Sequence, residues 1–275
     1  MTTQVVRTRA ELAAARAQLP GPVGLVPTMG ALHAGHLANI EASRQHTAAT
    51  VVSIFVNPMQ FDRADDLARY PRTFEQDLAL CEQAGVALVW HPDVLTMYPN
   101  GPVQVRVSAG ELADQLEGPH RPGHFDGVLT VVLKLLLTVR PDHAFFGEKD
   151  YQQLTLIRRM VADLDLPVQV HGVPTVRDSD GLALSSRNVF LSPAERAQAL
   201  RLNRALRAAQ SETSTPAAAL ARARAELAGL AVEYLEVRSA ALTAPTPGPG
   251  RVLVAAQVGN VRLIDNMPLN IGPAS

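Results

Sequence analysis

Residues 27–36 of the chain read Pro-Thr-Met-Gly-Ala-Leu-His-Ala-Gly-His, and they separate an apolar run from a helix-forming run. Residues 23–26 predict a short buried strand, and residues 37–42 predict a helix. A strand, a glycine-containing turn and a helix leave backbone N–H groups directed at an anion. The two histidines are three residues apart, so both imidazoles can reach the same ligand from one face of a helical turn.

The same ten residues also fit a plain strand-to-helix turn with two solvated histidines, because short motifs match by chance. Taken alone, the stretch leaves both interpretations open. Other stretches of the chain are needed to choose between the two interpretations.

Composition narrows the functional classes. The chain has 275 residues, 47% of them hydrophobic, and a formal net charge of −1, which gives no reason to expect nucleic acid as a partner. The longest apolar run, 128–139, contains Lys134 and is too short to span a bilayer, and the first residues do not resemble a signal peptide. The single cysteine, Cys81, cannot form an internal disulfide and is expected to pack in a helix. We therefore expect a globular cytoplasmic protein without membrane or nucleic-acid partners.

Strands and helices alternate through the first part of the chain. This rhythm predicts an α/β fold, a Rossmann-like doubly wound parallel sheet that binds ligands at the carboxyl ends of its strands. A further strand is predicted at 103–107 from its alternating pattern, and a short helix at 109–116. The other predicted strands are 23–26, 50–56, 86–90, 142–146 and 168–171, and the other predicted helices are 9–19, 37–42, 73–84, 125–139 and 150–163.

The pattern changes after residue 176. We predict a first, Rossmann-like domain over residues 1–176 and a smaller α+β lid domain over 177–275. The polar segment 177–181 is a candidate hinge. The second domain is predicted to contain helices at 193–210 and 216–228 and strands near 232–238, 250–257 and 260–265.

Three more polar stretches accompany the histidine turn. Asn57 and Gln60 follow a predicted strand and offer amide donors and acceptors for a polar substrate. Residues 147–153 follow another strand and contain Lys149, one of only two lysines among 25 Lys and Arg residues, where a compact ammonium suits a phosphate. Residues 184–187 read Leu-Ser-Ser-Arg and offer two hydroxyls and a guanidinium to a polyphosphate.

Each stretch has a structural alternative. Asn57 with the proline after it is a common turn initiator, Lys149 and Asp150 can form a surface ion pair, and Ser185 with Ser186 can cap a turn. Taken together, these structural alternatives are weaker, because they would scatter the polar residues over unrelated loops. The stretches of the first domain are instead expected at one end of one sheet. For Arg121 and His124 two interpretations stay open, a role in the site or a loop that leads into the long helix.

Motifs occur in order at residues 27–36, 55–61, 70–73, 145–153 and 182–188. They resemble those of the pantoate–β-alanine ligase (pantothenate synthetase) family. The resemblance continues to residues 263–266, near the end of the chain. Residues 27–36 alone would also suit class I aminoacyl-tRNA synthetases and cytidylyltransferases. Ala34 stands where the family often has a charged residue, and Leu184 where methionine is common, but neither removes a functional group.

The resemblance implies an activity. It is the ATP-dependent condensation of pantoate with β-alanine through a pantoyl adenylate, with release of AMP and pyrophosphate. Magnesium is expected on the ATP phosphates; its protein ligands stay open, with Asp77 and Asp150 as candidate outer ligands. The resemblance also suggests a homodimer. The alternatives are another nucleotidyltransferase or a non-catalytic nucleotide-binding module.

The resemblance also implies site residues. His33, His36, Lys149 and Arg187 would be catalytic. The ATP site would comprise Met29, Gly30, His33, Gly35, His36, Gly147, Glu148, Lys149, Asp150, Val176, Leu184, Ser185, Ser186 and Arg187. Pantoate and β-alanine would contact Pro27, Thr28, Met29, Asn57, Gln60, Arg121, His124 and Gln153.

Overall fold

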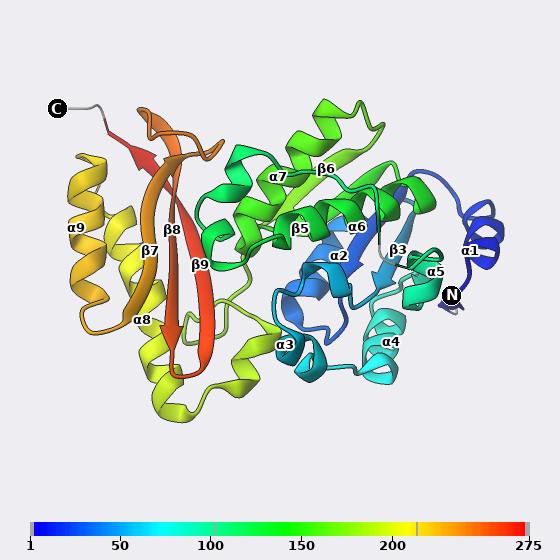
Figure 1. Ribbon diagram of the computed structural model, residues 1–275, viewed down its shortest axis with the longest axis horizontal. Helices are drawn as coiled ribbons and strands as arrows, with labels where there is room; N and C mark the ends of the chain where they lie inside the picture. The colour runs from blue at the N-terminus through cyan, green and yellow to red at the C-terminus, as the bar shows by residue number, and fades with distance from the viewer. Residues whose placement is uncertain (1–2, 102, 213, 273–275) are drawn as a thin grey trace. The chain divides into compact units, whose positions relative to one another are not determined.

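The computed structural model describes residues 3–101, 103–212 and 214–272, and the chain divides into two compact units (Figure 1). Unit 1 contains the chain up to Glu148 and Leu156–Pro174, and unit 2 contains Lys149–Thr155 and the chain from Thr175 onward. The sequence places the domain boundary after residue 176. The compact units separate between Pro174 and Thr175, and unit 2 also takes in the first turn of a helix that ends in unit 1.

Unit 1 is built on a six-stranded parallel sheet in the order β1-β4-β3-β2-β5-β6, which confirms the predicted doubly wound fold. The chain moves from β2 to β3 and β4 on one side, and to β5 and β6 on the other. The order therefore reverses between β2 and β5, and ligands of such sheets bind at the carboxyl ends next to a reversal. The strands are β1 (Gln4–Val6), β2 (Val23–Thr28), β3 (Ala49–Ile54), β4 (Leu88–Trp90), β5 (His143–Gly147) and β6 (Gln169–Val173).

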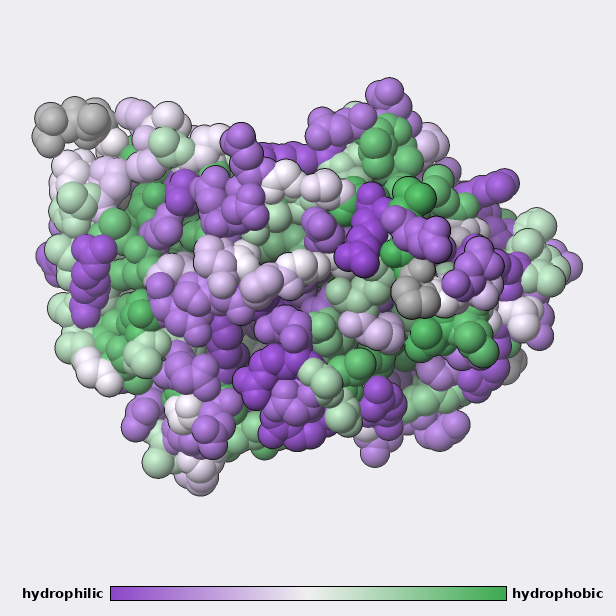
Figure 2. All heavy atoms as spheres, in the orientation of Figure 1, coloured by the Kyte–Doolittle hydropathy of each residue, from purple (hydrophilic) through white to green (hydrophobic). Residues whose placement is uncertain are grey.

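Helices and short 3-10 turns connect these strands. The longest, α6 (His124–Val139), is buried along most of its length, as its apolar sequence predicts. Within the described residues, no helix is long and apolar enough to cross a membrane. The face drawn in Figure 2 mixes hydrophilic and hydrophobic residues. The remaining elements are α1 (Arg9–Arg16), α2 (Ala34–His46), α3 (Ala64–Arg69), α4 (Phe74–Gln83), α5 (Val94–Met97), α7 (Tyr151–Asp163), η1 (Pro58–Gln60), η2 (Glu111–Asp114), η3 (Gly118–His120) and η4 (Glu148–Asp150).

Cys81 lies on α4 and has no exposed surface. It belongs to a core cluster with Val26, Ile40 and Val89, which agrees with the packing role expected from the sequence. Burial, with a smaller effect of the nearby Asp77 carboxylate, raises the pKa of the thiol to about 12. The thiol is therefore protonated and inert at neutral pH.

The strand predicted at 103–107 is wrong: the described part of this segment contains none. The backbone at residues 107 and 109 pairs instead with side chains of α6. The N–H of Val107 donates to Thr130 Oγ1 at 3.1 Å, and the N–H of Ala109 donates to Asp126 Oδ1 at 3.0 Å. Val105 is 87% exposed, so the alternating valines do not mark one buried face. The helix predicted at 109–116 is only the short η2.

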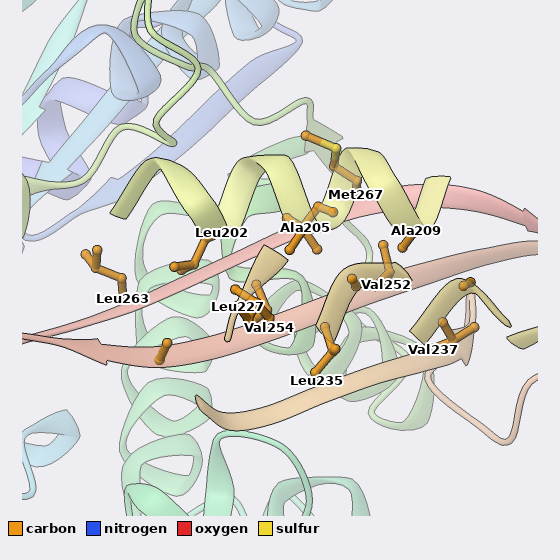
Figure 3. Packing of buried hydrophobic residues seen from close by; sticks show 14 of the residues in the cluster. Leu202, Ala205, Ala209, Leu227, Leu235, Val237, Val252, Val254, Leu263 and Met267 are labelled. Carbon is orange, nitrogen blue, oxygen red and sulfur yellow. The ribbon is translucent and has the colours of Figure 1, made fainter. Parts of the chain in front are cut away.

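Unit 2 is the predicted α+β structure. Its antiparallel sheet has the order β7-β8-β9, and an apolar core lies between the sheet and two helices (Figure 3). Leu202 and Ala205 on α8 pack in this core with Val252 and Val254 on β8. The elements are η5 (Ser186–Phe190), α8 (Pro193–Gln210), α9 (Pro216–Glu226), β7 (Ala231–Ser239), β8 (Gly248–Val258) and β9 (Val261–Ile271).

The candidate hinge 177–181 is a tight turn inside unit 2. The guanidinium of Arg177 makes a bidentate ion pair with Asp265 on β9, with N–O distances of 2.6 and 2.9 Å. Arg196 on α8 binds both Asp178 and Asp180. A hinge here would have to break these ion pairs, and unit 2 already begins before them. The structure therefore does not support the expected hinge.

Candidate active site

The turn between β2 and α2 is held by a buried carboxylate. Gly30 and Ala31 have positive φ values of 82° and 51°, a conformation that is costly for alanine. The N–H groups of Ala31 and Leu32 donate to the two carboxylate oxygens of Asp77 on α4, at 3.0 and 2.7 Å. Asp77 is 2% exposed. Its carboxylate therefore stabilises the strained turn.

This arrangement bears on magnesium. Both Asp77 oxygens also lie 3.3 Å from Thr73 Oγ1, so they are engaged by protein donors, and the expectation of an outer metal ligand does not fit them. Asp150 Oδ1 lies 3.6 Å from Lys149 Nζ. Among the described residues, no three His, Cys, Asp or Glu side chains are grouped to hold a metal ion.

His33 and His36 cap the N-terminus of α2 reciprocally. The N–H of Gly35 donates to His33 Nδ1 at 3.1 Å, and the N–H of His33 donates to His36 Nδ1 at 3.2 Å. The ring centroids are 4.1 Å apart. An Nδ1 that accepts a hydrogen bond carries no proton, so each imidazole is neutral and bears its proton on Nε2. His33 is the N-cap residue of α2, and the two rings lie next to each other; a shared ligand stays a prediction.

Gly35 is required by this cap. A Cβ atom at position 35 would lie 2.9 Å from His33 Cε1 and 3.0 Å from His33 Nδ1. Contacts this short force a shift of the ring. The glycine in the motif therefore allows the His33 ring to lie against the helix backbone.

The loop after β3 is organised by Asn57, which is 1% exposed. Its Nδ2 donates to Gln60 Oε1 and to the carbonyl of Gly127, both at 3.1 Å. Its Oδ1 accepts from the N–H of Met59 at 3.3 Å and from the hydroxyl of Tyr98 at 2.7 Å. The sequence places Asn57 in direct contact with substrate. The structure commits its amide to the protein instead, as the turn-initiator alternative expects.

Helix α6 packs closely against this loop. A Cβ atom on Gly127 would lie 2.2 Å from the carbonyl oxygen of Met59, so only glycine permits this approach. His124 at the start of α6 binds the carbonyl of Gln60 through Nδ1 at 2.8 Å. Arg121 binds the same carbonyl at 3.3 Å and His124 Nε2 at 3.0 Å. The structure thus brings Arg121 and His124 to the main chain of Gln60.

The carboxyl ends of three strands carry these groups along one edge of the sheet. β2 pairs in parallel with both β3 and β5, and these strands end at Thr28, Ile54 and Gly147. Parallel strands end at the same edge, so the histidine turn, the Asn57–Gln60 loop and Gly147 follow neighbouring strand ends. This placement agrees with the expectation from the sequence for the residues of unit 1.

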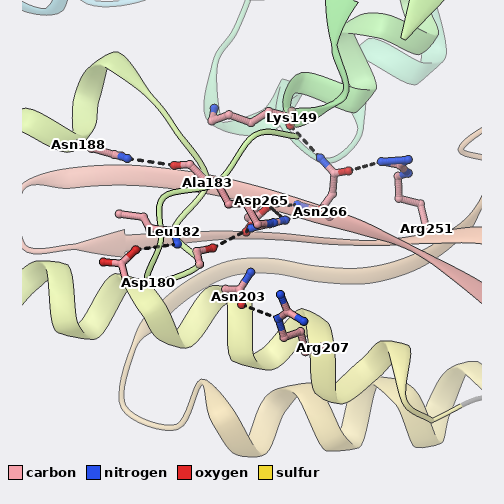
Figure 4. Close-up of polar contacts among 12 residues, drawn as sticks. Lys149, Asp180, Leu182, Ala183, Asn188, Asn203, Arg207, Arg251, Asp265 and Asn266 are labelled. Atoms are coloured by element: carbon pink, nitrogen blue, oxygen red, sulfur yellow. Dashed lines mark hydrogen bonds and ion pairs between the residues drawn. The ribbon is translucent and has the colours of Figure 1, made fainter. Parts of the chain in front are cut away.

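In unit 2, Lys149 is anchored by its main chain. Its carbonyl accepts from Asn266 Nδ2 at 2.8 Å, and Asn266 Oδ1 accepts from Arg251 at 2.6 Å (Figure 4). The Lys149 side chain is 21% exposed and lies 3.6 Å from the half-exposed Asp150 carboxylate. Asn266 belongs to the stretch 263–266 that resembles the ligase family, and sequence reasoning gave it no role. Its role in the structure is to hold the turn that carries Lys149.

Two of the predicted nucleotide-binding backbone groups pair with each other. The N–H of Leu184 donates to the carbonyl of Val176 at 3.0 Å. Ser185 is the N-cap of η5, and its Oγ accepts from the N–H of Arg187 at 3.3 Å. The alternative of a turn cap therefore describes Ser185, although its hydroxyl proton is still available for donation. Asn188 Nδ2 fixes the carbonyl of Ala183 at 3.0 Å (Figure 4).

Comparison with known proteins assigns the family. The family model described as pantoate-beta-alanine ligase matches residues 1–268. The chain belongs to the pantoate–β-alanine ligase family. It is 56% identical over 281 residues to the pantothenate synthetase of Salinispora arenicola (strain CNS-205), covering 99% of this chain and 100% of that protein. The resemblance stated from the motifs is thereby confirmed.

Solved structures of the ligase family share the fold. The crystal structure of pantothenate synthetase from Thermus thermophilus superimposes with a TM-score of 0.90 at 47% identity, covering 98% of this chain and 100% of the other. The pantoate–β-alanine ligase from Francisella tularensis, crystallised with beta-gamma ATP and beta-alanine, gives a TM-score of 0.82 at 34% identity, with coverage of 96% and 97%.

Proposed function

We propose that this chain condenses pantoate with β-alanine in an ATP-dependent reaction. The observation that carries the proposal is the ligase-family match over residues 1–268, which includes both units. The histidine turn alone is a feature of several nucleotidyltransferase families. A match that continues through the second unit favours the ligase over those alternatives.

The reaction has two steps. A carboxylate oxygen of pantoate attacks the α-phosphorus of ATP, and the bond from that phosphorus to the bridging oxygen breaks, so pyrophosphate leaves with the electron pair. The amine of β-alanine then attacks the acyl carbon of the pantoyl adenylate. The carbon–oxygen bond breaks, AMP leaves, and the nitrogen loses a proton. No enzyme nucleophile is needed.

His33 and His36 stabilise the charge on phosphate in this proposal. Their reciprocal cap leaves Nε2–H as the donor of each neutral ring. A neutral imidazole is a good hydrogen-bond donor and a very poor acid, so the two rings act as donors to phosphate oxygens rather than as proton sources. Donors fixed before the reaction are effective because they need no reorganisation as charge develops.

Lys149 and Arg187 supply the cations. We assign Lys149 to the α- and β-phosphates and Arg187, with Ser185 and Ser186, to the outer phosphates. The main chain of Lys149 is held by Asn266, which supports a fixed ammonium position. The other predicted nucleotide contacts remain part of the proposal: Met29, Gly30, Gly35, Gly147, Glu148, Asp150, Val176 and Leu184.

Pantoate is assigned to Gln60 and Gln153, with Met29 packing on its dimethyl carbon and Pro27 and Thr28 nearby. Asn57, Arg121 and His124 contribute through the loop that carries Gln60, since all three bind that residue. The division into an ATP- and pantoate-binding domain and a lid domain stays a prediction.

Three further assignments are proposals of the same kind. Magnesium accompanies ATP and neutralises its phosphates. The chain forms a homodimer, which sedimentation of the purified protein would test. The cytoplasmic location rests on a single cysteine, which is buried and cannot form an internal disulfide.

Pyrophosphate release tests the reaction. With ATP, magnesium and pantoate, the chain should release pyrophosphate, and pantothenate should form only when β-alanine is added. Another nucleotidyltransferase would retain the nucleotide on its product, and a binding module would bind ATP without turnover. Folded protein supplied with magnesium that releases no pyrophosphate would contradict the proposal.

Lys149→Ala tests the assigned cation. We expect adenylation to fall at least tenfold, about 1.4 kcal/mol of barrier, with little change in Tm. Lys149→Arg keeps the charge but replaces a compact ammonium by a planar fork, so it should restore only part of the rate. Unchanged turnover in Lys149→Ala would make this lysine a surface residue.

A further inference from the structure

A buried chain of hydrogen bonds connects Tyr98 to Gln60. The Tyr98 hydroxyl donates to Asn57 Oδ1 at 2.7 Å, and Asn57 Nδ2 donates to Gln60 Oε1 at 3.1 Å. Tyr98 is 6% exposed and Asn57 1% exposed, so water does not replace these bonds. Of the three residues in this hydrogen-bond series, only Gln60 is assigned to touch substrate.

Two main-chain groups determine the donor-to-acceptor direction of these hydrogen bonds. The oxygen of the Asn57 amide must face Met59, because the main-chain N–H of Met59 can only donate. Its nitrogen must face Gly127, because that main-chain carbonyl can only accept. The Asn57 amide therefore has one permitted orientation.

The orientation of Asn57 determines both neighbours. Its oxygen can only accept, so the Tyr98 hydroxyl must donate to it. Its nitrogen can only donate, so the atom of Gln60 that it meets must be Oε1. Gln60 Nε2 is then directed away from Asn57. Within the described part of the chain, Nε2 has no hydrogen-bond partner.

Tyr98 is built to keep its hydroxyl in place. The ring lies 6.1 Å from the ring of Phe55, and the ammonium of Lys134 lies 5.5 Å from its centroid. Its main-chain N–H donates to the carbonyl of Val94, which fixes the end of α5. Burial raises the pKa of Tyr98 to about 12, so the hydroxyl keeps its proton at neutral pH.

We propose that Tyr98 is a positioning residue for pantoate, which through Asn57 makes Gln60 present its amide NH₂ rather than its carbonyl to the substrate. The inference rests on the proposed function. An NH₂ group at this point binds oxygen acceptors, such as a carboxylate or hydroxyl oxygen of pantoate. It repels an ammonium group, so the same orientation disfavours β-alanine at this position.

Tyr98→Phe removes only the hydroxyl. We expect the KM for pantoate to rise about tenfold, while kcat and the KM for ATP change less than about twofold. Thr3→Val is the matched control, because Thr3 is 7% exposed and also makes one 2.7 Å hydrogen bond, from Oγ1 to the carbonyl of Val86 before β4. Its Tm should fall without a change in the KM for pantoate.

Asn57→Asp tests the donor-to-acceptor direction of the hydrogen bonds that connect Tyr98 to Gln60. A carboxylate cannot donate, so Gln60 should turn and present its carbonyl, and the KM for pantoate should rise more than in Tyr98→Phe. Adding Tyr98→Phe to Asn57→Asp should raise it no further, because the two residues act through one bond. Independent, multiplicative effects of the two changes would overturn the proposal.

The remaining outcomes distinguish failure of the proposed ligase reaction from failure of the positioning role of Tyr98. If the wild-type chain releases no pyrophosphate, the proposed function fails. If the wild-type chain turns over but Tyr98→Phe matches Thr3→Val in its KM for pantoate, the positioning role fails. Equal losses toward pantoate and ATP in Tyr98→Phe would also overturn it, since they indicate general disturbance of the fold.

Discussion

Helix α2 has histidines at both of its ends, and the two groups are bonded in opposite ways. At the N-terminus, His33 and His36 accept from main-chain N–H groups through Nδ1. At the C-terminus, Nδ1 of His46 faces the carbonyl of Ala42 at 2.8 Å and therefore donates. The end of a helix that a histidine occupies thus decides which ring nitrogen carries the proton.

The C-terminal group is a cluster of three rings. The ring centroids of His46 and His171 are 5.0 Å apart, and His171 Nε2 lies 2.9 Å from His143 Nδ1. His171 also stacks on Phe145, with centroids 4.7 Å apart. Burial, followed by the neighbouring His143, His46 and Arg158, lowers the pKa of His171. Protonation of His171 is therefore disfavoured in the folded chain.

Exchanging the histidines for alanine should give the largest contrast. His36→Ala removes a donor to phosphate, so adenylation should fall about a hundredfold, roughly 2.7 kcal/mol of barrier. His46→Ala at the other end of α2 should change the rate less than about twofold. Steady-state pyrophosphate release measures both. Similar losses in the two variants would remove the functional distinction between the helix ends.

A smaller effect is expected from Gly35→Ala. The new Cβ would lie 2.9 Å from His33 Cε1, so the ring must move, and we expect adenylation to fall about tenfold. The same change in a His33→Ala background should cost little, because the colliding ring is gone. An equal loss in both backgrounds would show that the glycine acts through the helix backbone and not through His33.

The smallest effect concerns pH and stability. A lowered pKa means that native His171 binds fewer protons than the unfolded chain, so stability is full above the unfolded value of about 6.5 and decreases as the pH falls through it. His171→Gln removes this titration. Its Tm should fall less between pH 7.5 and 5.5 than that of the wild-type chain, by a few degrees at most. A parallel decline in both proteins would exclude His171 as the source.

Local sequence predicts most of the elements and the order of the site stretches. The runs around β3 and α6 are long and apolar, and tertiary contacts do not overrule them. Residues 103–107 show where pattern fails, because alternation predicts a strand whether the backbone partner is another strand or a helix side chain such as Thr130. β1 is only three residues long and carries too little pattern to be detected.

Roles within the site depend on distant partners, which local patterns do not contain. Asn57 is bonded by Tyr98, 41 residues away, and the turn at Ala31 by Asp77, 46 residues away. From the sequence, Asn57 resembles a substrate contact and Asp77 a metal ligand, because the type of residue is all that is visible. In the structure, buried hydrogen bonds tie both side chains to other parts of the protein.

The buried thiol on α4 has a practical consequence. Cys81 is the chain's one cysteine, has no exposed surface and has a pKa of about 12, so thiol-reactive dyes should not label the folded protein. A cysteine introduced on the surface of each unit would then accept a dye while Cys81 stays in place. Fluorescence energy transfer between two such dyes, recorded with and without ATP, would measure the separation of the units directly in solution.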